Sequence, residues 1–186
     1  MREDFDAILG RAAQLADRET VDRVLDRMAS EITRDLAGRD PLVLAVMIGG
    51  LVPAAWLLQR LEFPLQLDYI HATRYRGGTR GADRIDWIAR PRTRLAGRVV
   101  LVIDDILDEG HTLAAILEDC RARGAAEVRS AVLVEKQHGR RVEGLQADYT
   151  GMRVEDRYLF GCGMDYHEHH RQHAAVYALA GEDDRG

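Results

Sequence analysis

The stretch VVLVIDDILDEGHTL, residues 99–113, carries the clearest structural pattern in the chain. Its apolar first part predicts a buried strand over residues 98–103, and the acids and glycine that follow predict a turn into a helix over residues 112–124. The first backbone N–H groups of a helix have no partner within the helix, and they lie at the positive end of its dipole. Residues 109–112 are therefore expected to hold a monophosphate.

The same stretch supplies groups that bind a sugar. Asp104 and Asp105 follow the predicted strand, where their carboxylates can accept hydrogen bonds from vicinal ribose hydroxyls or lie near a Mg²⁺ ion. Gly110 allows a phosphate to approach the backbone closely, and Thr112 offers a hydroxyl. The stretch lacks the second glycine and the Lys-Ser/Thr pair of the GxxxxGK[ST] loop, which disfavours a nucleoside triphosphatase. It predicts a site that holds ribose hydroxyls and a phosphate together.

Strand and helix patterns alternate along the rest of the chain. Apolar residues spaced i, i+3, i+4 predict N-terminal helices within residues 1–37, with a break near residues 17–20. Residues 73–84, TRYRGGTRGADR, have no apolar period and are expected to form a mobile loop. The other expected elements are strand 41–48, helix 53–61, strand 64–72, strand 85–89, strand 127–135 and strand 156–161. This order is typical of an α/β domain with a central, largely parallel sheet flanked by helices, whose ligands bind at the carboxyl ends of the strands.

Length and composition limit the kind of protein that this chain can be. A chain of 186 residues fits a single domain, residues 1–186, that buries a core without disulfides or metal staples. Hydrophobic residues make up 46% and charged residues 31%, and no apolar run approaches the roughly 18 residues of a membrane span. The N-terminus is charged and lacks the apolar part of a signal peptide, so the expected location is the cytoplasm. The net charge of −5 argues against nucleic-acid and membrane partners, which select basic surfaces.

On these residues, the stretch 99–113 resembles the phosphoribosyl pyrophosphate signature of the type I phosphoribosyltransferases, and residues 42–171 are similar to the hypoxanthine-guanine branch of that family. The resemblance implies the type I fold, with the mobile loop over the site and a small base-binding hood within residues 156–186. It also implies roles for the signature residues. Asp104 and Asp105 would contact the ribose hydroxyls, and Asp108 would act as general base for the purine N7 proton. The loop that would bind the 5′-phosphate consists of Glu109, Gly110, His111 and Thr112.

Later segments resemble the part of the family site that binds the base. Lys136, at the end of a predicted strand, matches the lysine that donates to the purine 6-oxo group. The segment RYLFG, residues 157–161, implies that Tyr158 stacks on the purine and that Leu159 contacts its edge through backbone groups. Taken alone, Lys136 would be expected at the surface and Tyr158 in the core. Their positions after the signature favour the functional roles.

Pyrophosphate is expected to bind at two further segments and under the mobile loop. In the family, a Lys-Gly pair after an early strand turns a backbone amide toward pyrophosphate through a cis peptide; Ile48 and Gly49 stand at that position and lack the lysine charge. Arg74 and Tyr75 replace the usual Ser-Tyr of the loop, where they are expected to close over pyrophosphate. Whether Arg74 restores the charge lost at Ile48 stays open. Arg171 matches the family's pyrophosphate-binding arginine.

The phosphate loop itself departs from the family pattern. Glu109 and His111 stand where threonine or serine and lysine are frequent. Phosphate binding would then depend more on backbone amides and on Thr112, which affects affinity more than the type of reaction.

A metal is expected because a diphosphate leaving group in a chain of negative net charge needs a cation. The resemblance implies Mg²⁺, held by Asp165 together with Asp104 and Asp105. An ion pair on a helix surface is the alternative reading of Asp165 and Arg171. The histidines within residues 167–173 suggest a transition-metal site, but a solvated histidine-rich turn is expected instead.

The resemblance implies an enzyme of purine salvage. It would convert hypoxanthine or guanine and phosphoribosyl pyrophosphate to IMP or GMP and pyrophosphate, with Mg²⁺ as cofactor, and would form a homodimer or homotetramer. Specificity for xanthine, adenine or uracil is an alternative, because the signature reads only ribose phosphate. A regulator that senses nucleotides without catalysis is the alternative of a different class.

Overall fold

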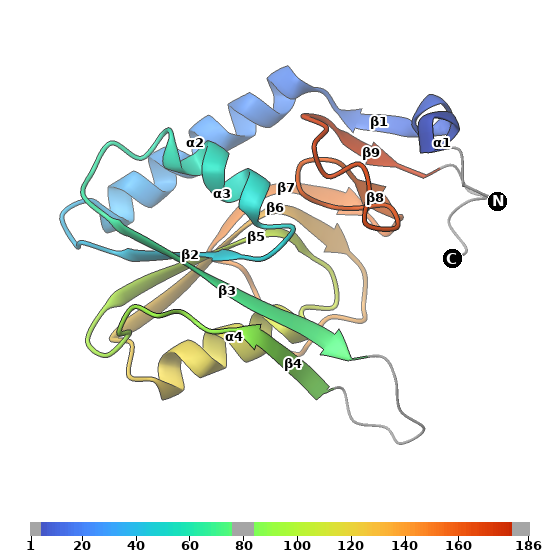
Figure 1. Ribbon diagram of the computed structural model, residues 1–186. Helices are drawn as coiled ribbons and strands as arrows, with labels where there is room; N and C mark the ends of the chain where they lie inside the picture. Colours follow the sequence, from blue (N-terminus) through green and yellow to red (C-terminus); the bar gives the residue numbers. More distant parts are fainter. Residues whose placement is uncertain (1–4, 76–83, 180–186) are drawn as a thin grey trace.

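A six-stranded sheet lies at the centre of the protein in the computed structural model, which describes residues 5–75 and 84–179 (Figure 1). Its strands run in the order β4-β3-β2-β5-β6-β7. Every neighbouring pair is parallel except β3 and β4, so the predicted, largely parallel sheet is confirmed. The strands are β2 (Leu42–Val46), β3 (Gln66–Tyr75), β4 (Arg84–Ala89), β5 (Val99–Leu107), β6 (Glu127–Gln137) and β7 (Tyr149–Glu155).

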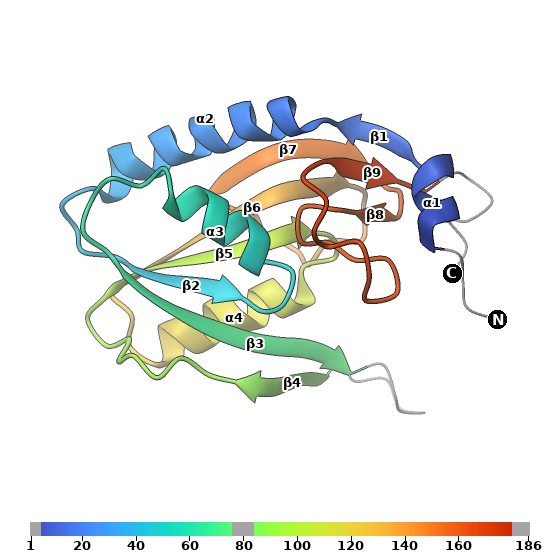
Figure 2. The ribbon, with the colours of Figure 1, turned by 45° about the horizontal axis from the view of Figure 1, so that its top comes forward.

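Helices cover both faces of this sheet (Figure 2). One face carries α2 (Arg18–Leu36) and α3 (Leu51–Leu58), and the other carries α4 (His111–Ala122). Asp17 caps α2, because its carboxylate accepts a hydrogen bond from the backbone N–H of Thr20 at 2.8 Å. The predicted break between the N-terminal helices lies at this cap.

An apolar layer fills the space on each side of the sheet. Leu25, Met28 and Ile32 of α2 are fully buried on one side, and Ile116 and Cys120 of α4 are fully buried on the other. A helix whose apolar residues lie along one stripe buries that stripe against the sheet in this way. Among the described residues, no helix is long and apolar enough to cross a membrane.

A second, small sheet forms a hood over the carboxyl ends of the central strands (Figure 2). It has the order β1-β9-β8 and joins β1 (Ala13–Ala16), β8 (Leu159–Phe160) and β9 (Val176–Ala178) in antiparallel pairs. The helix α1 (Phe5–Arg11) lies beside it. The hood therefore combines both ends of the chain.

The strands of the hood and β7 are the parts of the fold that the sequence patterns miss. β1, β7 and β9 are absent from the predicted elements, and the segment predicted to hold only helices, residues 1–37, contains β1. The strand predicted over residues 156–161 is confined to β8, and the longer strand β7 precedes it. β1, β8 and β9 have two to four residues, too few to show a period in the sequence, whereas β7 has seven residues and its length does not explain why it was missed.

Some predicted boundaries also move. The strand predicted over residues 98–103 continues to Leu107, so the two neighbouring acids of the signature lie on β5 rather than after it. The helix predicted from residue 53 begins at Leu51. The predicted mobile loop, residues 73–84, falls mainly on residues 76–83, which lie outside the described residues, as do residues 180–186 of the C-terminal segment.

Candidate active site

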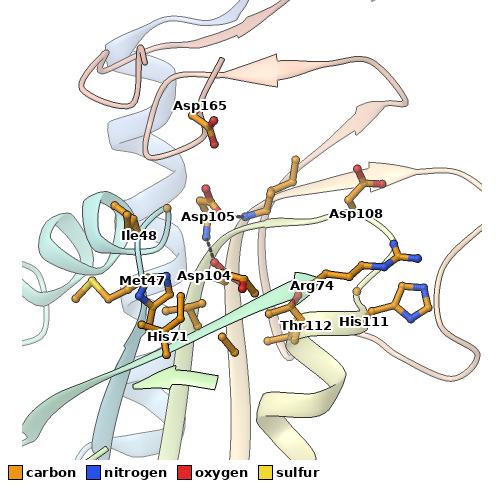
Figure 3. A pocket seen from close by; sticks show the side chains of 18 of the residues that line it. Met47, Ile48, His71, Arg74, Asp104, Asp105, Asp108, His111, Thr112 and Asp165 are labelled. Carbon is orange, nitrogen blue, oxygen red and sulfur yellow. Dashed lines mark hydrogen bonds between the residues drawn. The ribbon is translucent and has the colours of Figure 1, made fainter. Parts of the chain in front are cut away.

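The predicted site residues meet at the carboxyl ends of β2, β3 and β5, around a cavity of about 740 Å³ (Figure 3). Its lining includes Ile48, Gly49, Arg74, Asp104, Asp105, Asp108, Glu109, Gly110, His111, Thr112, Asp165 and Arg171. A smaller cavity of about 170 Å³ shares three of these acids and adds Lys136, Tyr158 and Leu159. The structure thus gathers all the predicted site residues except Tyr75, whose side chain lies outside the described residues.

The turn between β5 and α4 forms a cup at the wall of the cavity. Gly110 precedes α4 with a φ of +85°, and a Cβ there would clash with the side chain of Leu145. Glycine is the residue that fits both this backbone conformation and this space. His111 and Thr112 begin α4 and line the cavity, so the first N–H groups of the helix lie beside it. The predicted phosphate loop has the helix start that an anion site needs.

Arg74 joins this cup from the end of β3. Its guanidinium forms an ion pair with the carboxylate of Glu109. His111 Nε2 lies 3.6 Å from Oε2 of the same carboxylate, and Arg140 Nε lies 3.8 Å from Oε1. Figure 3 shows the Arg74 side chain extending toward His111 and away from Ile48. The positive charge of Arg74 is therefore placed at the phosphate loop, not at the position of the missing lysine.

Asp104 and Asp105 stand side by side on β5 and are held by local hydrogen bonds. Asp104 Oδ1 accepts from the N–H of Asp105 at 2.9 Å, and Asp105 Oδ1 accepts from the N–H of Ile106 at 2.8 Å. Burial raises the pKa of Asp104, and the neighbouring Asp105 carboxylate raises it further. Burial also raises the pKa of Asp105, against the lowering effect of its hydrogen bonds and of Arg171. Such a pair favours ligands that bring positive charge or hydroxyl donors.

The loop after β2 lies against these acids. The peptide bond between Met47 and Ile48 is cis, and the Ile48 side chain is 53% exposed. Gly49 has no room for a side chain, because a Cβ there would clash with the carboxylate of Asp105. Gly163 of the hood packs on the carbonyl of Gly49 in the same way. The loop is thus enclosed between β5 and the hood by two contacts that require glycine.

Asp108 is bound at both carboxylate oxygens. Lys136 Nζ donates to Oδ2 at 2.9 Å, and His138 Nε2 lies 2.6 Å from Oδ1. Burial raises the pKa of Asp108, but the hydrogen bonds and charges of Lys136 and His138 outweigh it, so that the pKa lies below its ordinary value. A proton acceptor and an ammonium donor therefore stand side by side in the smaller cavity.

The hood contributes an aromatic ring, a carboxylate and a guanidinium. Tyr158 is half-buried and meets Tyr166 edge to face, with ring centroids 5.9 Å apart. Leu159 is buried next to it on β8. Asp165 and Arg171 form an ion pair of 2.7 Å, and the same guanidinium donates to the carbonyl of Gly163. The ion pair of the alternative reading is therefore present, but it lines the cavity and lies on no helix.

Comparison with known families identifies the fold and the chemistry. Residues 11–167 match the profile of the family described as the phosphoribosyl transferase domain. The chain belongs to the phosphoribosyltransferase family. The match includes the signature, Lys136 and the hood residues up to Asp165, and it ends before Arg171.

Relatives of this phosphoribosyltransferase agree with the predicted branch. A hypoxanthine-guanine phosphoribosyltransferase of Lactococcus lactis is 32% identical over 151 residues, which cover 81% of each chain. A hypoxanthine-guanine-xanthine phosphoribosyltransferase of Tritrichomonas foetus is 30% identical and covers 84% of this chain and 85% of its own. The crystal structure of a hypoxanthine phosphoribosyltransferase from Staphylococcus aureus superposes with a TM-score of 0.89 at 24% identity, over 99% of this chain and 100% of the other. The predicted type I fold is confirmed.

The phosphoribosyltransferase site also contains residues that the sequence patterns did not single out. His138 contacts Asp108 from the bend that follows β6, two residues after Lys136, where no sequence pattern singles it out. His71 of β3 lines the larger cavity. The histidine-rich turn was predicted to be solvated, which is wrong for His170, because its side chain is buried and stacks on His173.

Proposed function

We propose that the chain transfers the phosphoribosyl group of phosphoribosyl pyrophosphate to hypoxanthine or guanine, giving IMP or GMP and pyrophosphate. The relatives are named for this activity. One observation supports it most strongly: the Lys136 ammonium and the Asp108 carboxylate are 2.9 Å apart in a small cavity that opens beside the phosphate cup. A 6-oxopurine offers an acceptor at O6 and a proton at N7 on one edge, and this pair complements both.

The larger cavity would hold the ribose phosphate. The 5′-phosphate fits the start of α4, where backbone N–H groups, the Thr112 hydroxyl and the Arg74 guanidinium converge. Asp104 and Asp105 would accept hydrogen bonds from the ribose hydroxyls, and their negative charge would favour the cationic ring of the transition state. Glu109 must then give up Arg74, because a carboxylate and a phosphate compete for the same guanidinium.

The smaller cavity would hold the base. Tyr158 offers a ring for stacking, and the backbone of Leu159 lies at the cavity edge. Lys136 would move from Asp108 to the 6-oxo oxygen, which frees Oδ2 of Asp108 to accept the N7 proton. Pyrophosphate would leave toward the backbone amide of Gly49 and the guanidinium of Arg171, two residues that also line the larger cavity.

The acids of the larger cavity fit a Mg²⁺ ion. Asp104, Asp105 and Asp165 offer carboxylate oxygens, the ligands that Mg²⁺ prefers. Burial and mutual repulsion raise the pKa of Asp104, so a positive charge at this point would restore its ionised form. Offsetting the negative charge of the diphosphate leaving group is the chemistry that Mg²⁺ supplies when bound.

An apolar surface supports the proposed homo-oligomer. Leu51, Leu67 and Tyr69 are each 45% exposed or more, and they line one hollow between α3 and β3. Contiguous exposed apolar groups mark surfaces that associate. Sedimentation equilibrium would test this proposal, with a dimer or tetramer expected and a monomer contradicting it. The cytoplasm remains the proposed location.

A panel of bases tests the proposed function. The protein is incubated with phosphoribosyl pyrophosphate, Mg²⁺ and one of hypoxanthine, guanine, xanthine, adenine or uracil, and nucleotide formation is followed by chromatography. Formation of IMP and GMP is expected. Nucleotide from adenine or uracil alone would overturn the base assignment and keep the phosphoribosyl transfer. Tight binding of phosphoribosyl pyrophosphate without any nucleotide would favour the nucleotide-sensing regulator.

A further inference from the structure

The structure points to His138 as a positioning residue for Asp108. We infer that it holds Oδ1 of Asp108 by a hydrogen bond, so that Oδ2 alone faces the base and accepts its proton. This inference rests on the proposed function, because it assigns a task within proton transfer from the purine.

The two contacts of Asp108 divide its oxygens between two partners. His138 Nε2 lies 2.6 Å from Oδ1, and Lys136 Nζ lies 2.9 Å from Oδ2. The Lys136 side chain lines the smaller cavity, so Oδ2 is the oxygen on the side of the base. The His138 side chain is only 4% exposed, whereas the Asp108 side chain is 40% exposed. Packing therefore fixes the imidazole, and the imidazole in turn fixes the carboxylate.

A second hydrogen bond decides where the imidazole carries its proton. The backbone N–H of Arg140 points at His138 Nδ1 across 3.1 Å. A backbone N–H can only donate, so Nδ1 must accept, and the ring proton resides on Nε2. Nε2–H then donates to Asp108 Oδ1. The loop after β6 thus selects the tautomer that serves the carboxylate.

Cationic side chains balance the carboxylates around the contact between His138 and Asp108. Lys136 Nζ lies 3.7 Å from Asp156 Oδ1, and Arg140 Nη2 lies 2.7 Å from Asp156 Oδ2. Asp108, His138 and Asp156 bring ligand atoms within 4.8 Å of one another, a spacing that a divalent cation can use. The cationic groups already paired with Asp108 and Asp156 disfavour that alternative.

The arrangement has a consequence for the reaction. When Lys136 turns to the 6-oxo group, Oδ2 of Asp108 loses its hydrogen-bond donor and can accept a proton. Oδ1 of Asp108 keeps its hydrogen bond from His138. In the transfer, the N7–H bond breaks, its electron pair stays on the purine ring, and an O–H bond forms at Oδ2 of Asp108. His138 keeps the carboxylate plane aimed at N7 and favours the ionised form before transfer.

His138→Phe removes the donor and keeps a ring of similar size. Asp108 must be ionised to accept the proton, so activity falls as the pH drops below its pKa in the free enzyme. Loss of a donor raises this pKa, and the acid limb of kcat/KM should move to higher pH by about one unit, the size expected for a hydrogen bond to a charged group. The KM for phosphoribosyl pyrophosphate should stay within roughly twofold.

Two matched variants complete the experiment. His138→Gln keeps an N–H donor and should restore much of the wild-type acid limb. Gln137→Ala changes the exposed neighbour on the other side of β6 and should leave the profile in place. An acid limb that does not move in His138→Phe, or moves equally in His138→Gln, would overturn the inference.

Nitrogen-15 NMR of the wild-type imidazole needs no variant and no activity. A proton on Nε2 of His138 is expected, together with a downfield shift of that proton from its bond to Asp108. A proton on Nδ1 would overturn the inference. The same spectra with added Zn²⁺ test the metal alternative, and chelation of Zn²⁺ by Nε2 would also overturn it. If the wild-type protein shows no phosphoribosyl transfer, the proposed function is contradicted. That outcome is distinct from an Nδ1 proton or a bound Zn²⁺, which would contradict only the role of His138.

Discussion

The turn between β5 and α4 and the hood of β1, β8 and β9 face each other across the active-site cavity. The turn is one continuous stretch, and β5 is paired on both sides by β2 and β6. The hood joins segments from both ends of the chain, through strands of only two to four residues. Gly163, between β8 and β9, packs on Gly49 of the loop after β2.

This difference suggests a division of labour. The residues proposed to bind ribose, phosphate and metal lie mainly on the rigid sheet and helix start, where their positions are fixed by a large core. Tyr158, the hood residue proposed to stack on the base, lies next to β8, whereas Asp165 and Arg171, proposed for metal and pyrophosphate, lie between β8 and β9. Changes at the turn should therefore affect turnover with every base, whereas changes next to β8 of the hood should act on base binding. The following predictions test that distinction.

Removal of divalent metal should have the largest effect. Excess chelator should abolish turnover with every base, because the diphosphate leaving group then lacks the cation that Asp104, Asp105 and Asp165 would hold. Added Mg²⁺ should restore the rate in a steady-state assay. Full activity in excess chelator would contradict the proposed metal.

Replacing Asp108 by Asn should lower kcat by about 10²–10⁴-fold, the range for loss of general base catalysis. Asn keeps the size and much of the hydrogen bonding, so binding of phosphoribosyl pyrophosphate should change little. Single-turnover kinetics and calorimetric titration would measure the two quantities. A kcat like that of the wild type would remove Asp108 from the reaction.

Gly161→Ala should disturb the hood and leave the turn intact. Gly161 has a φ of +90°, and a Cβ would clash with the carbonyl of Ala175 next to β9. The strained backbone should cost on the order of 1–3 kcal/mol of stability. The KM for hypoxanthine should rise more than the KM for phosphoribosyl pyrophosphate.

Gly38→Ala is the control for this variant. Gly38 has a φ of +79° but open space around the position of a Cβ, so it shares the backbone strain and lacks the clash. It should leave both KM values in place. Equal rises of the two KM values in Gly161→Ala would break the distinction between hood and turn.

The same contrast explains how far the sequence predicts the site. Residues 99–113 are local, and their order of apolar residues, acids, glycine and helix start can be read without knowledge of the fold. The hood depends on pairing between β1 and β9, more than 150 residues apart, and short strands leave no period that would reveal it. The resemblance to the phosphoribosyltransferase family located Tyr158 and Asp165 in this region, whereas the spacing of apolar and polar residues alone did not.

Side-chain partners were the other part that could not be predicted. Lys136 at the end of β6 and His138 in the bend after it meet Asp108, which follows β5. The end of β3 brings Arg74 to Glu109. These contacts depend on rotamers and on strand ends, which a single sequence does not specify. The role of Arg74 in closing over pyrophosphate stays a prediction, and its ion pair with Glu109 of the phosphate loop was not foreseen.

Glu109→Gln should have the smallest effect of these changes, and it should improve substrate binding rather than weaken it. It removes the carboxylate that competes with phosphate for Arg74, so the KM for phosphoribosyl pyrophosphate should fall by up to about fivefold, the limit for a partly exposed ion pair. Glu143→Gln, an exposed acid in the loop after β6, should leave this KM unchanged. A rise of the KM in Glu109→Gln would show that Glu109 assists binding.

The central claim is that Lys136, placed beside Asp108, reads the 6-oxo group of the base. An ammonium has three donors and no acceptor, so it faces the 6-amino group of adenine as donor against donor. Leaving such a group unpaired costs about 1–3 kcal/mol, which corresponds to roughly tenfold to a few hundredfold in specificity.

The most direct test measures kcat/KM for hypoxanthine, guanine and adenine on the wild type and on Lys136→Gln, whose amide can donate or accept. The wild type should favour hypoxanthine over adenine by at least about tenfold. The variant should lose activity on hypoxanthine and guanine and narrow the ratio to adenine. A wild type that uses adenine as well as hypoxanthine, or a ratio unchanged by the substitution, would contradict the claim.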